Sequence, residues 1–183
     1  SVKHSAQKVL QATNAWLFAQ TQNSPYRFNK DKGYVCTFSS IIFKSNTFHI
    51  FHSGDSRIYR LSNKTLEQLT QDHRRVVSED TSYLTRALGI HPLLELDYLA
   101  QPLEIEDVFI LATDGIYEYI DSLTITRFIS EYDHDLDLAC EHILQHALEN
   151  GSTDNLTIQI VKILDLPEHQ LEEVQQKISD LPL

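Results

Sequence analysis

The sequence predicts an α+β fold built on antiparallel sheet, and three observations support this prediction. Short β-branched and aromatic segments occur in pairs joined by turn residues, which is typical of hairpins. Segments with helical periodicity precede and follow this strand-rich block, and they do not alternate with its strands. An apolar run at 108–113 predicts a central strand that is covered on both faces. Together these observations argue against a doubly wound parallel sheet.

The first element is a helix predicted over residues 5–20. Its expected buried face consists of residues spaced about 3.6 positions apart, namely Val9, Leu10, Thr13, Trp16 and Leu17. The stretch 21–33 that follows is polar and contains a proline, so we expect a loop there.

Two hairpins are predicted next. Their paired strands are 34–43 with 47–53, and 56–62 with 65–70. The first pair is joined through 44–46, and the second flanks Asn63 and Lys64, a two-residue connection of the kind that hairpins favour.

The middle of the chain gives weaker signals. Residues 72–89 show no strong period, although Asp72 and Ser82 could each cap a short helix. After Pro92, the alternation of apolar and polar residues over 94–101 predicts another strand.

Two helices and a last strand are predicted towards the C-terminus. One helix begins near Asp121, and a second runs through 135–148 and stops at Asn150-Gly151. The last strand is expected at 155–164. The apolar positions expected to face the core are Leu123, Ile125, Phe128 and Ile129 in the first helix, and Leu136, Ala139, Cys140, Ile143 and Ala147 in the second. After Pro167 we expect a polar helix with a narrow stripe of Leu171, Val174 and Ile178.

Composition limits the function classes. A chain of 183 residues suits one domain, and its net charge of −11 disfavours nucleic acid as a partner while suiting metal cations or basic peptides. No transmembrane segment or signal peptide is apparent. Cys36 and Cys140 are far apart, so we expect two buried thiols in a reducing compartment, either the cytoplasm or a cytoplasmic domain of a larger protein.

Three aspartates stand where predicted strands end or begin: Asp55, Asp114 and Asp154. Oxygen ligands of this kind suit hard cations such as Mg²⁺ or Mn²⁺, which keep several waters. Each aspartate has a small neighbour, and we expect Gly54, Gly115 and Thr153 to let a metal, water or substrate approach closely.

Each aspartate taken alone has a structural explanation that we favour over a functional one. Asp55 could belong to a hairpin turn, Asp114 could cap a helix, and Asp154 could form the turn that leads into a strand. The presence of all three, in this order, favours a metal site.

The order of these motifs resembles the PP2C family of metal-dependent protein serine/threonine phosphatases. The matching segments span roughly 54–163 and are GDSRIYRL, LTQDH, LTRALG, FILATDGIYEYI and GSTDNLTIQIV. The sequence of these segments is also similar to the phosphatase module of bacterial proteins that join a phosphatase to a kinase. The resemblance implies an antiparallel β-sandwich flanked by helices, in α-β-β-α layers.

The resemblance also implies the chemistry of the site. Family members hold two Mg²⁺ or Mn²⁺ ions bridged by an aspartate and a water, which attacks phosphoserine or phosphothreonine in proteins. By this resemblance Asp114 and Asp154 match metal ligands, and Asp55 matches the aspartate associated with a third, weaker metal. Arg57 and Asn155 match positions that shape the site. The implied partners are phosphoproteins or phosphopeptides, together with a linked or cognate serine/threonine kinase.

The sequence departs from the family before its first helix. The family's upstream acidic stretch, phosphate-binding arginine and Asp-Gly-rich loop are not found, so no catalytic or substrate-binding residue is assigned. We therefore expect 1–165 to be a partial phosphatase domain lacking its N-terminal part, as a fragment or a degenerate homologue, and 166–183 to be a C-terminal helix or linker. The alternative function is a catalytically dead, phosphatase-like binding or regulatory domain.

Other candidates are weaker. Asp72-His73 could act in acid/base chemistry, but a helix cap is favoured. His142 and His146 have a zinc-like spacing on one helix, yet a solvated face that also includes His134 is favoured. Arg86 could steer a phosphopeptide or pair with an acidic residue, and these two roles remain open.

Overall fold

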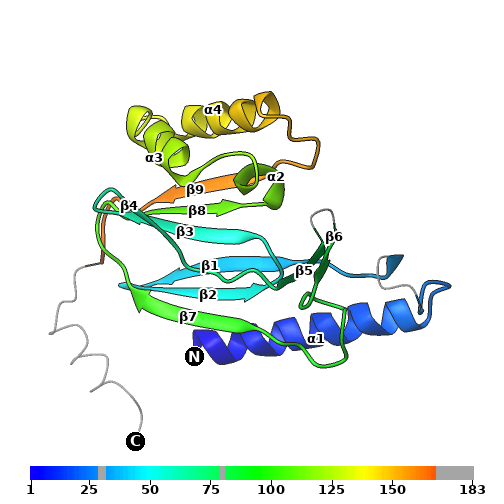
Figure 1. Ribbon diagram of the computed structural model, residues 1–183. Coiled ribbons are helices and arrows are strands. Elements are labelled where there is room, and N and C mark those ends of the chain that lie inside the picture. Colours follow the sequence, from blue (N-terminus) through cyan, green and yellow to red (C-terminus); the bar gives the residue numbers. More distant parts are fainter. Residues whose placement is uncertain (29–31, 79–80, 168–183) are drawn as a thin grey trace, which may run out of the picture.

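The structure is a computed structural model that describes residues 1–28, 32–78 and 81–167. Figure 1 shows its elements stacked in four layers: a long helix, two antiparallel sheets and a final layer of helices. This arrangement confirms the predicted α+β sandwich flanked by helices. The tail 168–183, where the polar helix with Leu171, Val174 and Ile178 was predicted, lies outside the described residues.

The first layer is α1 (Val2–Gln22), which begins at Ser1, whose side chain accepts a hydrogen bond from the His4 amide. The predicted buried face is confirmed at Leu10 but wrong at Val9 and Trp16, which are 65 and 59% exposed. The residues that α1 buries are Leu10, Asn14 and Thr21.

Asn14 explains this rotation of the helix, because it is a polar residue at the centre of the buried face. Its Nδ2 donates to the carbonyl oxygens of His91 and Pro92 at 3.0 and 3.3 Å, and its Oδ1 accepts from the Gly89 amide at 2.9 Å. A buried amide with its hydrogen bonds satisfied carries little penalty. A pattern based on apolar residues alone therefore misses Asn14 and includes exposed positions such as Val9.

The sheet next to α1 has the order β1-β2-β7 and is antiparallel. Its strands are β1 (Phe38–Lys44), β2 (Thr47–Ser53) and β7 (Asp97–Pro102). The predicted hairpin is confirmed, with Lys44 paired to Thr47 at its turn. The predicted strand at 94–101 is confirmed as β7.

The second sheet has the order β4-β3-β8-β9 and is also antiparallel. Its strands are β3 (Arg57–Ser62), β4 (Thr65–Gln68), β8 (Val108–Ala112) and β9 (Ile158–Lys162). Asn63 and Lys64 both have positive φ, 49° and 63°, as a two-residue hairpin turn requires. The second predicted hairpin is therefore confirmed.

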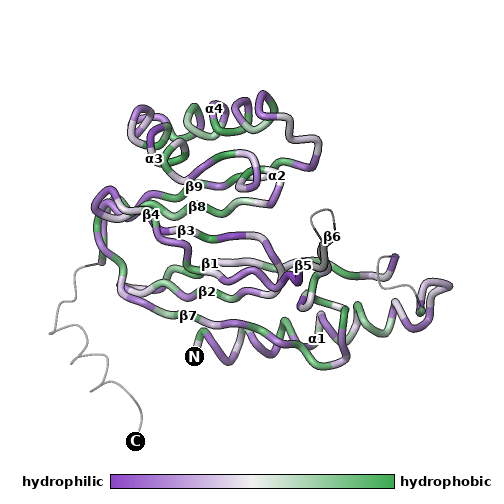
Figure 2. The backbone as a smooth tube through the Cα atoms, viewed as in Figure 1, coloured by the Kyte–Doolittle hydropathy of each residue, from purple (hydrophilic) through white to green (hydrophobic). Residues whose placement is uncertain are grey.

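Strand β8 lies in the interior of the molecule, as its apolar sequence predicts. Phe109 is fully buried between the two sheets, where it packs in a cluster with Phe48, Ile50 and Ile58. Val108 and its alternate neighbours face the helices on the other side. In Figure 2, β8 is coloured towards the hydrophobic end of the scale.

The helical layer contains α2 (Asp114–Tyr117), α3 (Ser122–Glu131) and α4 (Leu136–Glu149). Asp121 and Asp135 cap α3 and α4 through their side chains. Gly151, at φ 92°, follows the end of α4 as predicted. The residues that α3 and α4 bury are Ile125, Ile129, Ala139, Ile143 and Ala147, while Leu123 is exposed.

Residues 72–89 contain a small hairpin, in the region where Asp72 and Ser82 could each have capped a short helix. Its strands are β5 (Arg74–Ser78) and β6 (Thr81–Leu84). Asp72 caps no helix, because its carboxylate is engaged by Arg57, with Nη2 at 2.7 Å. The competing side-chain interaction overrides the local capping signal.

The cysteines and the helices bear on two expectations from composition. Both cysteines are free, but Cys36 is exposed and Cys140 only partly buried, so the prediction of two buried thiols was wrong. Over the described ranges, no helix has the length and apolar character needed to cross a membrane.

Candidate active site at the strand ends

The three predicted site aspartates lie at one edge of the second sheet. Asp55 precedes β3, Asp114 follows β8, and Asp154 precedes β9. The start of β3 and the start of β9 both pair with the end of β8, at Ala112, because the strands are antiparallel. The sheet topology therefore gathers residues that are far apart in the sequence.

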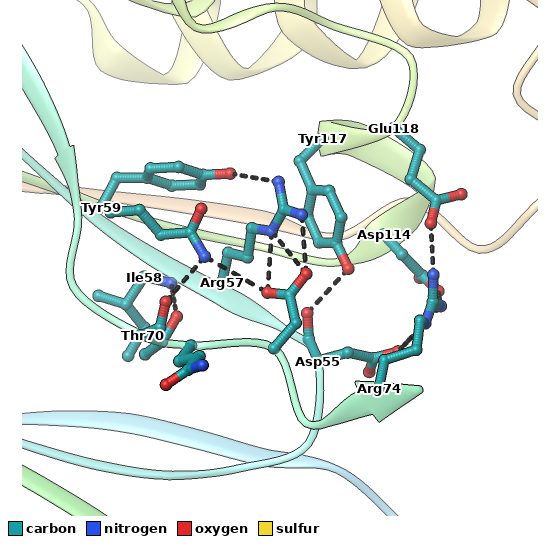
Figure 3. A network of polar contacts seen from close by, with 12 residues as sticks. Asp55, Arg57, Ile58, Tyr59, Thr70, Arg74, Asp114, Tyr117 and Glu118 are labelled. Carbon is teal, nitrogen blue, oxygen red and sulfur yellow. Dashed lines mark hydrogen bonds and ion pairs between the residues drawn. The ribbon is translucent and has the colours of Figure 1, made fainter. Parts of the chain in front are cut away.

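Asp55 and Asp114 converge on one guanidinium group, that of Arg74. Its Nη2 lies 2.9 Å from Oδ2 of Asp55 and 2.9 Å from Oδ2 of Asp114, and its Nε donates to Asp55 at 3.0 Å. Its Nη1 donates to Glu118, which lies one turn beyond Asp114. Figure 3 shows the carboxylates arranged around this guanidinium.

Burial sets the electrostatics of this cluster. Asp55 is only 8% exposed, and burial raises the pKa of its carboxyl; Asp114 raises it further, while Arg74 lowers it without cancelling the effect. Partial burial lowers the pKa of Arg74, but the hydrogen bond that it donates to Glu118 and the charge of Asp55 outweigh this effect, so the net shift is upwards. The acidic cluster thus holds Arg74 in its charged form.

Asp154 lies in the neighbouring loop and has a different environment. Its side chain is exposed, and its Oδ1 accepts a hydrogen bond from the Asn155 amide at 2.7 Å. The loop is bound to the turn after β8, because Ser152 Oγ donates to the Gly115 carbonyl at 2.8 Å. That Asp114 and Asp154 share a metal ion remains a prediction.

The small neighbours serve the backbone itself. A Cβ on Gly115 would lie 2.7 Å from the Asn155 carbonyl oxygen, so glycine lets the two loops approach each other. Gly54 has φ 136°, a conformation that disfavours other residues, and it packs against Thr37. These contacts give both glycines a packing role, and their expected role in metal or substrate access stays a prediction.

Arg57 braces the site from behind. Its guanidinium forms a two-pronged pair with Asp72 and lies 3.6 Å from the ring centroid of Tyr117. The Tyr117 hydroxyl donates to the Asp55 carbonyl at 2.9 Å, as Figure 3 shows. Arg57 therefore supports the backbone of Asp55, in agreement with its expected role in shaping the site.

A buried histidine pair lies behind Gly54. His73 accepts from the Gly54 amide at its Nδ1, 3.1 Å away, so its Nε2 carries the proton and donates to Asp97 at 3.0 Å. The ring centroids of His52 and His73 are 4.8 Å apart. Arg86 pairs with Asp97 and Glu95, which confirms the expected ion pair, while a role in steering a phosphopeptide stays a prediction. His73 thus holds the turn that carries Asp55.

A solvated face was predicted for the histidines of α4, but His142 and His146 pack against aromatic rings. His142 stacks on Tyr132, with 4.5 Å between ring centroids, and also on Phe128. His146 meets the edge of Phe128. These contacts give the pair an aromatic packing role.

The donors at these strand ends determine how well a divalent metal fits there. Asp55 and Asp114 offer hard oxygen ligands. The positively charged Arg74 side chain lies between them and contacts both carboxylates. Among the described residues, no three His, Cys, Asp or Glu side chains come together closely enough to hold a metal by themselves. The chain thus fits Mg²⁺ or Mn²⁺ in charge and donor chemistry, and it supplies part of a ligand set.

The sequence prediction missed Arg74, Glu118 and Tyr117. Glu118 had a usable signal, because it follows Asp114 by four residues on a helix. Arg74 had none, since its partners Asp55 and Asp114 lie 19 and 40 residues away.

Comparison with known families and sequences identifies related proteins. The sequence pattern of the family described as Protein phosphatase 2C matches residues 2–165. A serine/threonine phosphatase, stp, of Listeria welshimeri is 28% identical over 145 residues, which are 71% of this chain and 57% of the relative. The serine/threonine protein phosphatase PstP of Mycobacterium tuberculosis is 24% identical over 180 residues, covering 90% of this chain and 34% of PstP. The chain thus spans little more than half the length of the stp relative.

Solved structures show the same fold. PppA, a regulatory component of the type VI secretion system of Pseudomonas aeruginosa, has a TM-score of 0.73 and 26% identity, over 84% of this chain and 66% of PppA. The PstP catalytic domain in complex with two manganese ions has a TM-score of 0.70 and 25% identity, over 85% of this chain and 68% of that domain. A serine/threonine phosphatase from S. agalactiae reaches a TM-score of 0.79 at 19% identity over 90% of this chain and 71% of its own, which supports the fold alone.

Proposed function

The chain belongs to the protein phosphatase 2C family, and from this premise we propose that it is part of a metal-dependent phosphatase acting on phosphoserine and phosphothreonine in proteins. The carrying observation is the convergence of Asp55 and Asp114 at the sheet edge, beside the loop of Asp154. The serine/threonine phosphatase names of the sequence relatives support the substrate class.

The proposed cofactor is Mg²⁺ or Mn²⁺, held by Asp114 and Asp154 with Asp55 nearby. When bound, such an ion supplies an activated water and neutralises charge on the phosphoryl group. The two manganese ions named for the related PstP domain support this assignment. The hard carboxylate oxygens of the three aspartates suit either ion.

The remaining residues of the site would orient these ligands. The Tyr117 hydroxyl fixes the Asp55 backbone, and Arg57 fixes the Tyr117 ring. His73 holds Gly54, so that the turn carrying Asp55 is anchored on both sides. A rigid frame of this kind keeps ligands in productive geometry.

The proposal includes an incomplete catalytic domain over about 1–165, followed by a helix or linker over 166–183. The family's upstream motifs are not part of this sequence, and they would supply the bridging ligand. The proposed partners are phosphoproteins and a linked or cognate serine/threonine kinase, as the resemblance implies. The two free thiols support a cytoplasmic location for the domain.

The second candidate is a catalytically dead domain that binds phosphoproteins or regulates a partner. One observation favours it: Arg74 already pairs with two of the carboxylates that a metal would need, Asp55 and Asp114. The two candidates differ in whether the natural protein containing this chain turns over substrate.

The test measures hydrolysis of a phosphothreonine peptide and of p-nitrophenyl phosphate by that natural protein across a Mn²⁺ titration. We expect Mn²⁺-dependent turnover, reduced at least about tenfold by Asp114→Asn or Asp154→Asn, because each change replaces a charged oxygen ligand with a weaker neutral one. Asp137→Asn, at an exposed position of α4, is the matched control and should leave turnover unchanged.

Two results would oppose the proposal. Mn²⁺-independent or undetectable hydrolysis by the natural protein would favour the binding domain. Near-normal turnover of the Asp154→Asn variant at limiting Mn²⁺ would reduce that aspartate to a turn residue.

A further inference from the structure

Arg74 occupies the place where Asp55 and Asp114 face each other. One nitrogen, Nη2, lies 2.9 Å from a carboxylate oxygen of each aspartate, and a second, Nη1, donates to Glu118. The two carboxylates come from separate strand ends and share one positive group. A cation that bridges two carboxylates produces the same arrangement. Figure 3 shows the guanidinium between them.

The need for a cation at this place follows from burial. Asp55 is 8% exposed, and a carboxylate taken out of water is costly unless a positive group accompanies it. The Arg74 side chain is itself only 24% exposed. The contact is therefore shielded from bulk water, unlike an ordinary surface ion pair.

Arg74 is also fixed in position by the chain around it. The preceding residue, His73, donates its amide to the Gly54 carbonyl at 2.8 Å and accepts from the Thr85 amide at 2.7 Å. The His73 ring accepts from the Gly54 amide as well. Since Gly54 adjoins Asp55, the backbones that carry the arginine and its partner are bound to each other.

From these contacts we infer that Arg74 is a built-in cation that takes the place of a divalent metal ion between Asp55 and Asp114. The inference rests on the proposed metal-dependent function and adds a residue that limits how many ions the site accepts. Divalent ions are then confined to the side of Asp114 that faces the Asp154 loop. Asp55 acts through Arg74 and contacts no metal while the arginine is present.

The experiment measures Mn²⁺ binding by the 183-residue chain with isothermal titration calorimetry, together with the melting temperature with and without Mn²⁺. The variants are Arg74→Gln, Asp55→Asn and the double variant. Arg75→Gln is the matched control, because it removes the same charge from the adjacent, exposed position. Arg74→Lys keeps the charge.

We expect Arg74→Gln to bind Mn²⁺ at least about tenfold more tightly than the wild-type chain. The electrostatic repulsion between a guanidinium and a nearby Mn²⁺ is larger than the free energy of a tenfold change in affinity, and the substitution removes it. Its melting temperature should rise more on Mn²⁺ addition. The double variant should lose this gain, and Arg75→Gln and Arg74→Lys should behave as the wild type.

If Arg74→Gln folds but gains no Mn²⁺ binding, or if its gain survives Asp55→Asn, the inference is wrong. If the Arg74→Gln variant is unfolded without metal, recovery of a melting transition on Mn²⁺ addition supports the inference. If Mn²⁺ fails to fold this variant, the inference is wrong. Phosphatase activity is judged separately in the natural protein. Mn²⁺-dependent turnover there, without a gain in Arg74→Gln, would defeat this inference alone; a gain without any turnover would defeat the proposed function alone.

Discussion

At the scale of single residues, two arginines near one site, Arg57 and Arg74, have different roles. Arg57 has one carboxylate partner, Asp72, and stacks on Tyr117, so its charge is matched by a single opposite charge. Arg74 contacts Asp55 and Asp114 together with Glu118, so carboxylates outnumber the arginine. The surplus negative charge lies where the proposed metal binds.

His52 makes a residue-scale prediction about pH. It is 1% exposed, its Nε2 donates to the Gln71 carbonyl at 3.0 Å, and its Nδ1 accepts from Ser39 at 2.8 Å. Burial lowers the pKa of His52, and the neighbouring His73 lowers it further, while the Gln71 carbonyl, Asp97 and Asp72 oppose the shift without cancelling it. The neutral ring is therefore the form that the fold accommodates.

A depressed histidine pKa in the folded state means that the unfolded chain binds the proton first. The free energy of unfolding should therefore fall as pH drops below about 6.5, by at most about 1.4 kcal/mol per pH unit for this one group. Urea unfolding between pH 7.5 and 5 measures this slope. His52→Gln should flatten the slope, whereas His4→Gln, at an exposed residue of α1, should keep it. An unchanged slope in the His52 variant would contradict the prediction.

At the scale of elements, α1 is held to the rest of the molecule by a polar contact. Asn14 connects the helix to the loop before β7 through the Gly89 amide and two carbonyls. A helix whose buried face centres on an asparagine depends on that contact for its orientation. The exposed positions of Val9 and Trp16 follow from it.

Asn14→Ala should lower the free energy of unfolding by about 2–4 kcal/mol, because it leaves the buried Gly89 amide and its neighbouring carbonyls without partners. Gln11→Ala, on an exposed position of the same helix, should change it by less than about 0.5 kcal/mol. Urea denaturation of both variants gives the comparison. Equal effects of the two substitutions would show that α1 is placed by its apolar contacts alone.

At the scale of the whole molecule, the two cores differ in what they join. One cluster lies between the sheets around Phe48 and Phe109, and the other joins the second sheet to α2, α3 and α4. Strand β8 contributes to both and ends at Ala112, two residues before Asp114, the first residue of α2. A proposed metal ligand thus follows directly after a well-packed strand, which gives that ligand a rigid base.

The 183-residue chain by itself should bind Mn²⁺ weakly and hydrolyse p-nitrophenyl phosphate poorly or not at all. Its described residues contain no complete group of metal ligands, so two ions would lack the bridging carboxylate that fixes them. Steady-state assays on the purified chain, beside the natural protein, measure the difference. Robust Mn²⁺-dependent turnover by the chain alone would require another residue to take the bridging role.

The sequence by itself determined the features that depend on near neighbours. Turn residues such as Asn63 and Lys64 located the hairpins, and the apolar run of β8 predicted a strand covered on both faces. The order of Asp55, Asp114 and Asp154 predicted the site edge, because each follows or precedes a strand that alternation or apolarity reveals. These signals arise within a few positions of the chain.

Only the tertiary structure decided the features that depend on distant partners. The face of α1 was chosen by the Asn14 contact with Gly89, 75 residues away. Asp72 lies outside any helix because Arg57, 15 residues before it, engages its carboxylate. Arg74 meets Asp55, Asp114 and Glu118 at separations of 19, 40 and 44 residues, since packing places the β5–β6 hairpin against the strand ends. Pairings over such separations leave no local period or turn signal, so no pattern in the sequence could reveal them.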